Sequence, residues 1–272
     1  MALAGALGYL GRSVRDKLRA TLGGDDADVL LVTAHPDDEC MFFTPTIRTL
    51  VERTGAAGGG PESAGDGCGV ALLCLSNGDA AGLGAVREKE LLEAAEGLGV
   101  PRDDVTVLND ERLQDGMRTT WPAKAVCGAV RREVERLRSK PLRRKRRLCT
   151  IITFDAGGVS GHPNHRACWE GVSELMRDTA FCRKHNIRAW TLRSEPLFLK
   201  YLGPFGAAAR YLQHAYRPRL SAAAVCGLGG VSAAAWAMRA HESQMVWFRH
   251  FYLAFTTYTM VNILDPLVAM PT

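Results

Sequence analysis

Short apolar runs alternate with helical patterns along most of the chain. The runs that predict buried strands are Val29–Val32, Val70–Leu75, Val105–Leu108 and Leu148–Phe154. The helical patterns cover Pro36–Val51, Glu88–Leu98, Ala123–Leu137 and Pro163–Leu175. Strands that alternate with helices at this spacing predict a mostly parallel sheet flanked by helices. We therefore expect a single α/β domain with a Rossmann-like sheet.

The same pattern sets the expected boundaries of this domain. Residues 28–272 are expected to form it, because they show no internal repeat and only one set of core-forming runs. Residues 1–27 are expected to form an amphipathic or membrane-proximal segment, and residues 53–69 a glycine-rich loop. The apolar stripe of the first segment consists of Leu3, Leu7, Leu10, Val14 and Leu18, with basic residues beside it. Such a stripe suits either a helix at a membrane or a helix packed on the domain itself.

Polar side chains gather where the predicted strands end. His35, Asp37 and Asp38 follow the first strand, Asp110 follows the third, and Asp155 follows the fourth. The carboxyl ends of parallel strands meet at one edge of a sheet, where ligands of such folds bind. Charged groups beside a core are costly unless they are paired or bind a metal. This edge is therefore the predicted active site.

Two short motifs at this edge have the composition of a metal site. HPDD (residues 35–38) and HPNH (residues 162–165) each place a proline at a helix start. Consecutive first-turn aspartates point about 100° apart, so one can bind a metal while the other faces its open side. Two histidines and one aspartate form a known kind of catalytic zinc set. Aspartates can also complement a helix dipole, and a buried histidine can simply donate to a carbonyl.

Four segments carry a resemblance to a known family. They are AHPDDE (34–39), REKELL (87–92), TFDAGGVSGHPNH (153–165) and SQMVWFR (243–249). Together they resemble the LmbE-like superfamily of metal-dependent de-N-acetylases. More narrowly, they resemble the N-acetylglucosaminyl-phosphatidylinositol de-N-acetylase family, which acts in the second step of GPI-anchor biosynthesis. The resemblance runs from about Val29 to Tyr252, and the last two segments point to the eukaryotic lipid branch.

The resemblance implies a role for each residue of the two histidine motifs. It makes His35, Asp38 and His165 ligands of a divalent metal and Asp37 the general base for the attacking water. His162 would protonate the leaving amine and, as imidazolium, stabilise the oxyanion. Mixed nitrogen and oxygen ligands suit Zn²⁺ best, although ferrous iron and manganese also accept them.

Three further residues are candidates for supporting roles. Arg87 is expected either to hold the phosphate or sugar hydroxyls of the substrate or to be a solvated helix end. Asp110 is expected to bind a glucosamine hydroxyl, and Asp155 to orient a ligand histidine. Asn164 stands where bacterial members commonly carry aspartate, and Glu39 is expected to be structural.

Composition limits the cellular setting. Eight scattered cysteines without a C-x-x-C pair indicate a reduced, cytosol-facing protein. The basic run 131–147 suits either anionic headgroups or solvent, and the aromatic segment 247–264 suits either a membrane boundary or a core helix. With the resemblance, these features predict the cytoplasmic face of the endoplasmic reticulum membrane, a membrane surface and a phosphatidylinositol glycolipid substrate.

Other functions remain as competing interpretations. One alternative is that this protein deacetylates a soluble N-acetylglucosamine conjugate, and another is that it is a non-catalytic metal-binding module on the same fold. No G-x-G-x-x-G follows the first strand, which counts against a dinucleotide. The net charge of +5 is mild, and no nucleic acid is expected as a partner.

Overall fold

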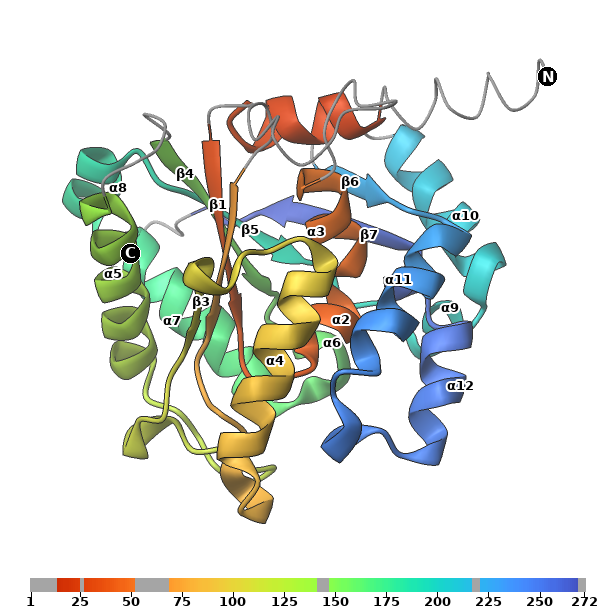
Figure 1. Ribbon diagram of the computed structural model, residues 1–272. Coiled ribbons are helices and arrows are strands. Elements are labelled where there is room, and N and C mark those ends of the chain that lie inside the picture. Colours follow the sequence, from red (N-terminus) through yellow and green to blue (C-terminus); the bar gives the residue numbers. More distant parts are fainter. Residues whose placement is uncertain (1–13, 25–26, 52–68, 141–146, 217–220, 269–272) are drawn as a thin grey trace, which may run out of the picture.

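A seven-stranded sheet forms the centre of the protein. The structure, a computed structural model, describes residues 14–24, 27–51, 69–140, 147–216 and 221–268. The sheet has the order β3-β2-β1-β4-β5-β7-β6 (Figure 1). Five strands run parallel: β1 (Ala27–Thr33), β2 (Gly69–Cys74), β3 (Val105–Val107), β4 (Arg147–Phe154) and β5 (Arg188–Leu192). Strand β7 (Val261–Pro266) is antiparallel to both β5 and β6 (Ala222–Val225). The predicted α/β class is confirmed.

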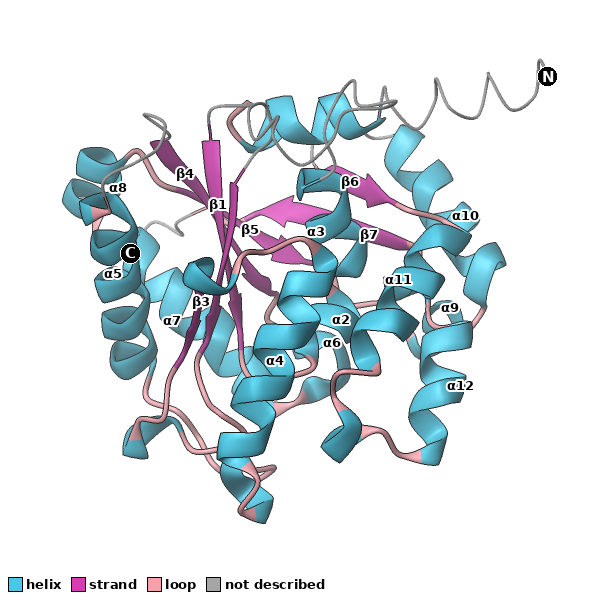
Figure 2. Ribbon diagram, in the orientation of Figure 1, coloured by secondary structure: helices cyan, strands magenta, loops and turns pink. Residues whose placement is uncertain are grey.

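Helices cover both faces of this sheet, as Figure 2 shows. One face carries α3 (Thr44–Val51), α4 (Gly84–Leu98) and α11 (Leu228–Met238). The other carries α5 (Ala123–Ser139), α7 (Pro163–Arg177) and α8 (Thr179–His185). Further α-helices are α2 (Asp38–Phe42), α6 (Gly158–Gly161), α9 (Leu197–Lys200), α10 (Gly203–Tyr216) and α12 (Trp247–Phe255). Because the central strands are buried on both faces, their sequences are almost continuously apolar.

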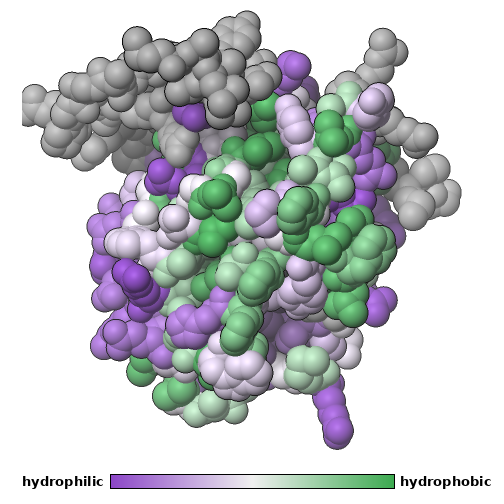
Figure 3. All heavy atoms as spheres, turned by 90° about the vertical axis from the view of Figure 1, so that its right-hand side faces the viewer, coloured by the Kyte–Doolittle hydropathy of each residue, from purple (hydrophilic) through white to green (hydrophobic). Residues whose placement is uncertain are grey.

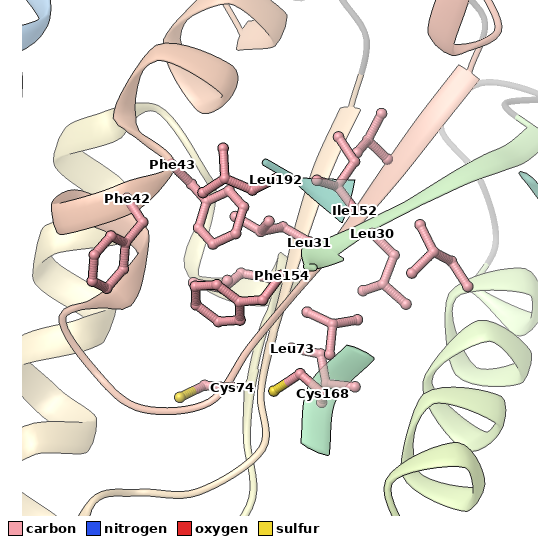
Figure 4. Close-up of a cluster of buried hydrophobic side chains, with 14 of the residues drawn as sticks. Leu30, Leu31, Phe42, Phe43, Leu73, Cys74, Ile152, Phe154, Cys168 and Leu192 are labelled. Atoms are coloured by element: carbon pink, nitrogen blue, oxygen red, sulfur yellow. The ribbon is translucent and has the colours of Figure 1, made fainter. Parts of the chain in front are cut away.

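The core lies directly beneath the carboxyl edge of the sheet. Leu30 and Leu31 of β1 and Ile152 of β4 are almost fully buried. Figure 4 shows these side chains with Phe42 and Phe154, which lie toward the end of the strands. The edge that carries the polar motifs is therefore packed against buried apolar side chains.

The predicted helix over residues 36–51 is divided into two. Helix α2 ends at Phe42, Phe43 leaves the helical conformation, and α3 starts at Thr44. Pro45 has no amide hydrogen to donate to the carbonyl of Met41, which breaks the helical ladder. The hydroxyl of Tyr252 lies 3.5 Å from that carbonyl oxygen and donates to it instead.

Part of the chain after residue 185 differs from the pattern-based expectation. Strands β5, β6 and β7 were not predicted, and residues 222–224 of β6 are all alanine. Alanine favours helices, so here sheet pairing overrides local propensity. The aromatic segment 247–264 divides into the exposed helix α12 and the buried strand β7, so it is not one core-packed helix.

The amino-terminal segment is described in part. Residues 14–22 are helical, Leu18 and Leu22 are buried in the core, and Arg19 donates to the carbonyl of Leu50. This portion packs on the domain, as one of the two interpretations expected. Leu3, Leu7 and Leu10 lie outside the described residues, as does nearly all of the glycine-rich loop. Within the described ranges, no helix has the length and apolar character needed to cross a membrane.

The basic run at the end of α5 makes several contacts within the protein. Arg131 pairs with Asp178 and Arg136 with Glu133. Arg138 donates to the carbonyl of His185. Residues 141–146 of the run lie outside the described part. Six cysteines of the described chain are free thiols: Cys40, Cys74, Cys127, Cys168, Cys182 and Cys226.

Candidate active site

The loop between β1 and α2 folds its acidic side chains back onto its own backbone. One oxygen of Asp38 accepts the amides of Ala34 and His35, both at 2.9 Å. Glu39 accepts the amide of Asp37 at 3.0 Å. Asp37 has a φ of 111°, a left-handed conformation that costs a non-glycine residue free energy. The loop persists in this conformation because these hydrogen bonds hold it.

Asp38 and His165 converge on one point at the carboxyl edge. The free Oδ1 of Asp38 lies 3.0 Å from Nε2 of His165. The other ring nitrogen of His165 lies 3.1 Å from the carbonyl oxygen of Gly158, to which it can donate. The His165 ring stacks on Phe154 at 4.0 Å, which fixes its plane. Burial opposes ionisation of Asp38, but attraction to His165 outweighs it and holds the pKa well below the usual range.

His35 completes a three-histidine cluster. One ring nitrogen from each of His35, His162 and His165 lies within 4.8 Å of the others. Nε2 of His35 lies 3.1 Å from a carboxylate oxygen of Asp115 and 2.9 Å from the side-chain nitrogen of Asn164. Burial lowers the pKa of His35, but the hydrogen bond to Asp115 and the nearby aspartates raise it overall. Nitrogen donors beside the buried Asp38 carboxylate fit a divalent metal ion in chemical type.

Asp37 lies beside these groups without joining their hydrogen bonds. Its Oδ2 forms an ion pair of 2.6 Å with Nη1 of Arg249, which comes from α12. Asp37 is 6% exposed, and burial raises its pKa, although the charge of Arg249 acts in the opposite direction. A buried carboxylate with a raised pKa is suited to accept and return a proton.

His162 is fixed as a neutral ring. Its Nδ1 accepts the backbone N–H of Asn164 at 3.2 Å, so the proton of the neutral ring is on Nε2. Burial, with repulsion from His165 and His35, lowers the pKa of His162 to about 4. A lowered pKa favours the neutral ring in the free protein, and the expected role of His162 during the reaction stays a prediction. Nε2–H remains available as a hydrogen-bond donor.

Arg87 holds the loop between β1 and α2 through hydrogen bonds. Its guanidinium donates to the carbonyls of Gly78 at 2.7 Å and Pro36 at 3.0 Å. It also donates to Gln244 at 2.5 Å and to Asp115 at 3.3 Å. With these four acceptors and a side chain that is 14% exposed, Arg87 is not a solvated helix end. Its contact with the substrate stays a prediction.

A second buried network supports the loop from the other side. Nε2 of His241 lies 2.7 Å from Glu39, and Nδ1 of His241 lies 2.9 Å from the side-chain nitrogen of Gln244. Gln244 in turn donates to Glu90. The HPDDE, REKELL and SQMVWFR segments therefore meet in one hydrogen-bonded structure around Asp37.

Two predicted site residues have other partners. Both oxygens of Asp110 are bound by Arg112 at the surface. Asp155 accepts from Ser194 and from the amides of Gly157 and Gly158, so it holds the loop before α7 and contacts no histidine in the described structure. A carboxylate this close to a strand end satisfies the nearest backbone N–H groups first. The carbonyl of Gly158 takes the expected position behind His165.

Sequence analysis missed four residues at the site. Asp115 lies beyond the predicted strand end, in a loop without a local signal. Trp121 is buried and packs edge-on against His35, with ring centroids 5.9 Å apart. Gln244 and Arg249 belong to SQMVWFR, which was recognised as a segment but given no roles. Their contacts become visible only when α12 is placed against the loop.

Comparison with known proteins agrees with this architecture. The family model described as "GlcNAc-PI de-N-acetylase" (PIG-L) matches residues 30–176. A probable N-acetylglucosaminyl-phosphatidylinositol de-N-acetylase of Schizosaccharomyces pombe is 36% identical over 87% of this chain and 85% of its own. The chain belongs to the GlcNAc-PI de-N-acetylase family. The Bos taurus member is 32% identical, over 91% of this chain and 86% of its own.

Solved structures share the fold of this family at much lower identity. One is an N,N'-diacetylchitobiose deacetylase from Pyrococcus horikoshii, with a TM-score of 0.54 and 16% identity over 89% of this chain and 80% of that one. Another is a deacetylase of the teicoplanin biosynthetic pathway, with a TM-score of 0.52 and 14% identity over 88% of this chain and 97% of that one. These likenesses establish the LmbE-like fold.

Proposed function

We propose that the protein removes the N-acetyl group of N-acetylglucosaminyl-phosphatidylinositol, giving glucosaminyl-phosphatidylinositol and acetate. This is the second step of GPI-anchor biosynthesis. The observation that carries the proposal is the buried Asp37 carboxylate next to Asp38, at the edge where Asp38 faces His165 and the three histidines cluster. Family membership supplies the class of substrate.

The donor set fits a divalent metal, with His35, Asp38 and His165 as ligands. One oxygen of Asp38 accepts two backbone amides, and one nitrogen of His165 faces a backbone carbonyl. The remaining oxygen of Asp38 and Nε2 of His165 face each other at 3.0 Å, where both can turn to a metal. Mixed nitrogen and oxygen donors favour Zn²⁺. When bound, such an ion supplies Lewis acidity to the attacking water and the amide carbonyl.

Asp37 is the proton carrier of the proposed reaction. Its carboxylate takes a proton from the attacking water as the new C–O bond forms. The C–N bond then breaks, and Asp37 returns the proton to the leaving nitrogen. Burial raises the pKa of Asp37, which favours the protonated form that this second step needs, while Arg249 keeps the ionised form accessible for the first.

His162 acts in the proposed mechanism as a neutral hydrogen-bond donor. Its Nε2–H is directed by the hydrogen bond that Nδ1 accepts from the amide of Asn164. A fixed donor in a partly buried site stabilises the negative oxygen of the tetrahedral intermediate without moving at the moment of reaction. The proton for the amine then comes from Asp37.

The setting of the reaction belongs to the same proposal. A phosphatidylinositol glycolipid resides in a membrane, so the protein must work at a membrane surface. The family's role in GPI-anchor biosynthesis and the free cysteines support the cytoplasmic face of the endoplasmic reticulum.

Acetate release by the purified, metal-analysed chain tests the function. We expect release from N-acetylglucosaminyl-phosphatidylinositol, loss of activity with a chelator, and recovery with Zn²⁺. A water-soluble N-acetylglucosamine conjugate, assayed beside it, should be a poorer substrate. His165→Ala should lose both metal and activity, because a three-ligand set has no redundancy. Metal-loaded protein that releases no acetate from either substrate would instead indicate a non-catalytic binding module.

A further inference from the structure

The exposed large apolar side chains are concentrated on one part of the protein. Of the 19 that the described part of the chain exposes, 15 lie between residues 197 and 255. Many are aromatic and more than half exposed: Phe198, Phe205, Tyr216, Trp236, Trp247, Phe248, Phe251 and Phe255. We call this set, with Leu197, Leu202, Leu212 and Leu228, the aromatic face. An exposed apolar patch this extensive marks an interaction site.

The aromatic face is continuous across several elements. Helix α12 contacts both α10 and α11, and α9 packs on α10. Figure 3 shows this side of the molecule, with apolar side chains spread widely over it. A groove of about 240 Å³ opens between α10, β6 and α11, lined by residues such as Ala207, Tyr211, Val225 and Leu228. The face is therefore hollowed as well as apolar.

The charge of this region is unusually one-sided. Residues 196–264 contain six lysines and arginines but only one carboxylate, Glu242. The whole chain has 29 aspartates and glutamates in 272 residues, so a stretch of this length would ordinarily carry several. Lys200 and Arg210 are buried, and Arg249 pairs with Asp37, so the described part of this face presents few charges of either sign. With Glu242 as its one carboxylate, the stretch can approach anionic headgroups with little electrostatic repulsion.

The aromatic face is joined to the candidate site through one helix. On α12, Trp247, Phe248 and Phe251 are exposed, whereas Arg249 reaches inward to Asp37 at 2.6 Å. A membrane or protein surface that contacts α12 from outside therefore lies close to the loop between β1 and α2, which carries Asp37. A substrate held in that surface by its acyl chains would have its headgroup near the site.

We propose that the aromatic face docks the protein onto the surface of an anionic phospholipid bilayer. Trp, Phe and Tyr side chains enter the headgroup region, and the groove between α10 and α11 takes up apolar lipid atoms. The biological reason for this docking rests on the proposed function, since only a membrane-borne substrate needs it. The physical docking does not require catalysis.

Tryptophan quenching tests which surface meets the lipid. The full chain is mixed with vesicles of phosphatidylcholine and phosphatidylinositol that contain brominated acyl chains but no N-acetylglucosaminyl-phosphatidylinositol. Residues 1–27 contain no tryptophan, so binding through that segment alone would leave the fluorescence unquenched. Trp247 and Trp236 lie on the aromatic face. We expect quenching on binding, and Trp247→Phe should lose much of it while still binding.

Vesicle sedimentation supplies the matched comparison. Phe251→Glu should weaken binding about tenfold or more, because it removes an apolar contact and adds a negative charge. Val268→Glu makes the same charge change at an exposed position after β7 and should stay within about twofold of the unmodified chain. Phosphatidylcholine vesicles without the anionic lipid should bind more weakly.

Three results would overturn the proposal. They are vesicle binding without tryptophan quenching, equal binding by Phe251→Glu and Val268→Glu, and a dimer in sedimentation velocity that Phe251→Glu dissociates. Because these vesicles lack substrate, docking can succeed or fail independently of acetate release. A failure of the proposed function is therefore distinguishable from a failure of docking.

Discussion

Nη1 of Arg249 lies 2.6 Å from Oδ2 of Asp37, although 212 positions separate the two residues in the chain. The pair joins α12, whose outer side is exposed and aromatic, to the loop after β1. Both side chains are largely shielded from water, so the attraction is stronger than in a surface ion pair. Asp37 is thereby held in a left-handed conformation with its carboxylate beside the histidine cluster.

Loss of the Arg249 charge should slow the reaction without emptying the metal site. Arg249→Gln is expected to lower kcat by about a hundredfold, because Asp37 loses the group that orients its carboxylate. Arg249→Lys should recover part of the rate, since it restores the charge. Arg239→Gln removes an exposed cation at the end of α11 and serves as the control. Metal content by elemental analysis should stay constant in all three, and an unchanged kcat in Arg249→Gln would rule out this role.

The adjacent aspartates should respond differently to the same substitution. Asp37→Asn is expected to keep its metal and to lose roughly a hundredfold to ten-thousandfold in kcat, the usual contribution of a positioned acid or base. Asp38→Asn should lose metal affinity, with activity partly restored by excess Zn²⁺. Metal content and kcat measured on both variants decide the assignment. If Asp37→Asn emptied the site and Asp38→Asn left it loaded, the two roles would be reversed.

Arg87 should act on the rate and on stability more than on substrate affinity. Arg87→Lys leaves one ammonium where a guanidinium served four acceptors. We expect kcat and Tm to fall while KM changes by less than about threefold. Arg102→Lys, in an exposed pair with Glu96, is the control. A large rise in KM at unchanged Tm would instead indicate that Arg87 contacts the substrate.

Asp115 and Asp110 provide a matched test of which carboxylate serves the site. Asp115→Asn should lower kcat by about tenfold or more, because it removes the charge that faces His35 and Arg87. Asp110→Asn should leave kcat and KM within about twofold, because its partner is the surface residue Arg112. Steady-state kinetics on both variants makes the comparison. A larger change in kcat or KM for Asp110→Asn than for Asp115→Asn would indicate that Asp110 contacts the substrate.

Glu90 should contribute stability that depends on pH. Burial raises its pKa, but hydrogen bonds from Ser243 and Gln244 outweigh this and lower the pKa below the ordinary value of 4.5. A carboxyl group with a lowered folded-state pKa stabilises the protein above its unfolded-state pKa, and this stability is lost as the pH falls through the folded-state pKa. Glu90→Gln should therefore reduce the free energy of unfolding at neutral pH by about 1–3 kcal/mol.

The difference should shrink as the solution is acidified below the ordinary glutamate pKa. Urea unfolding of both proteins at neutral and acidic pH measures it. Glu93→Gln, at an exposed position on the same helix, should change little at either pH. A difference between Glu90→Gln and the unmodified chain that persists unchanged in acid would mean that packing, rather than charge, is responsible.

The sequence alone determined the central architecture and the position of the site. Strands β1 to β4 are apolar because both faces of a parallel sheet are covered, so their pattern is readable from the chain. The two histidine motifs follow strands whose carboxyl ends must meet at one edge. The sequence therefore predicted that His35, Asp38, His162 and His165 lie together at this edge. The structure places the four side chains at the carboxyl edge of the sheet.

Only the tertiary structure decided which groups support that site. Asp110 and Asp155 were chosen because they follow strands, yet each carboxylate is taken by close neighbours. Asp115 carries no local signal, and Arg249 lies in a recognised segment that suggested no role, because their contacts depend on where distant segments pack. Periodicity in a sequence records which side of an element is buried. The partner of a polar side chain depends on the distance between elements, which the folded chain alone sets.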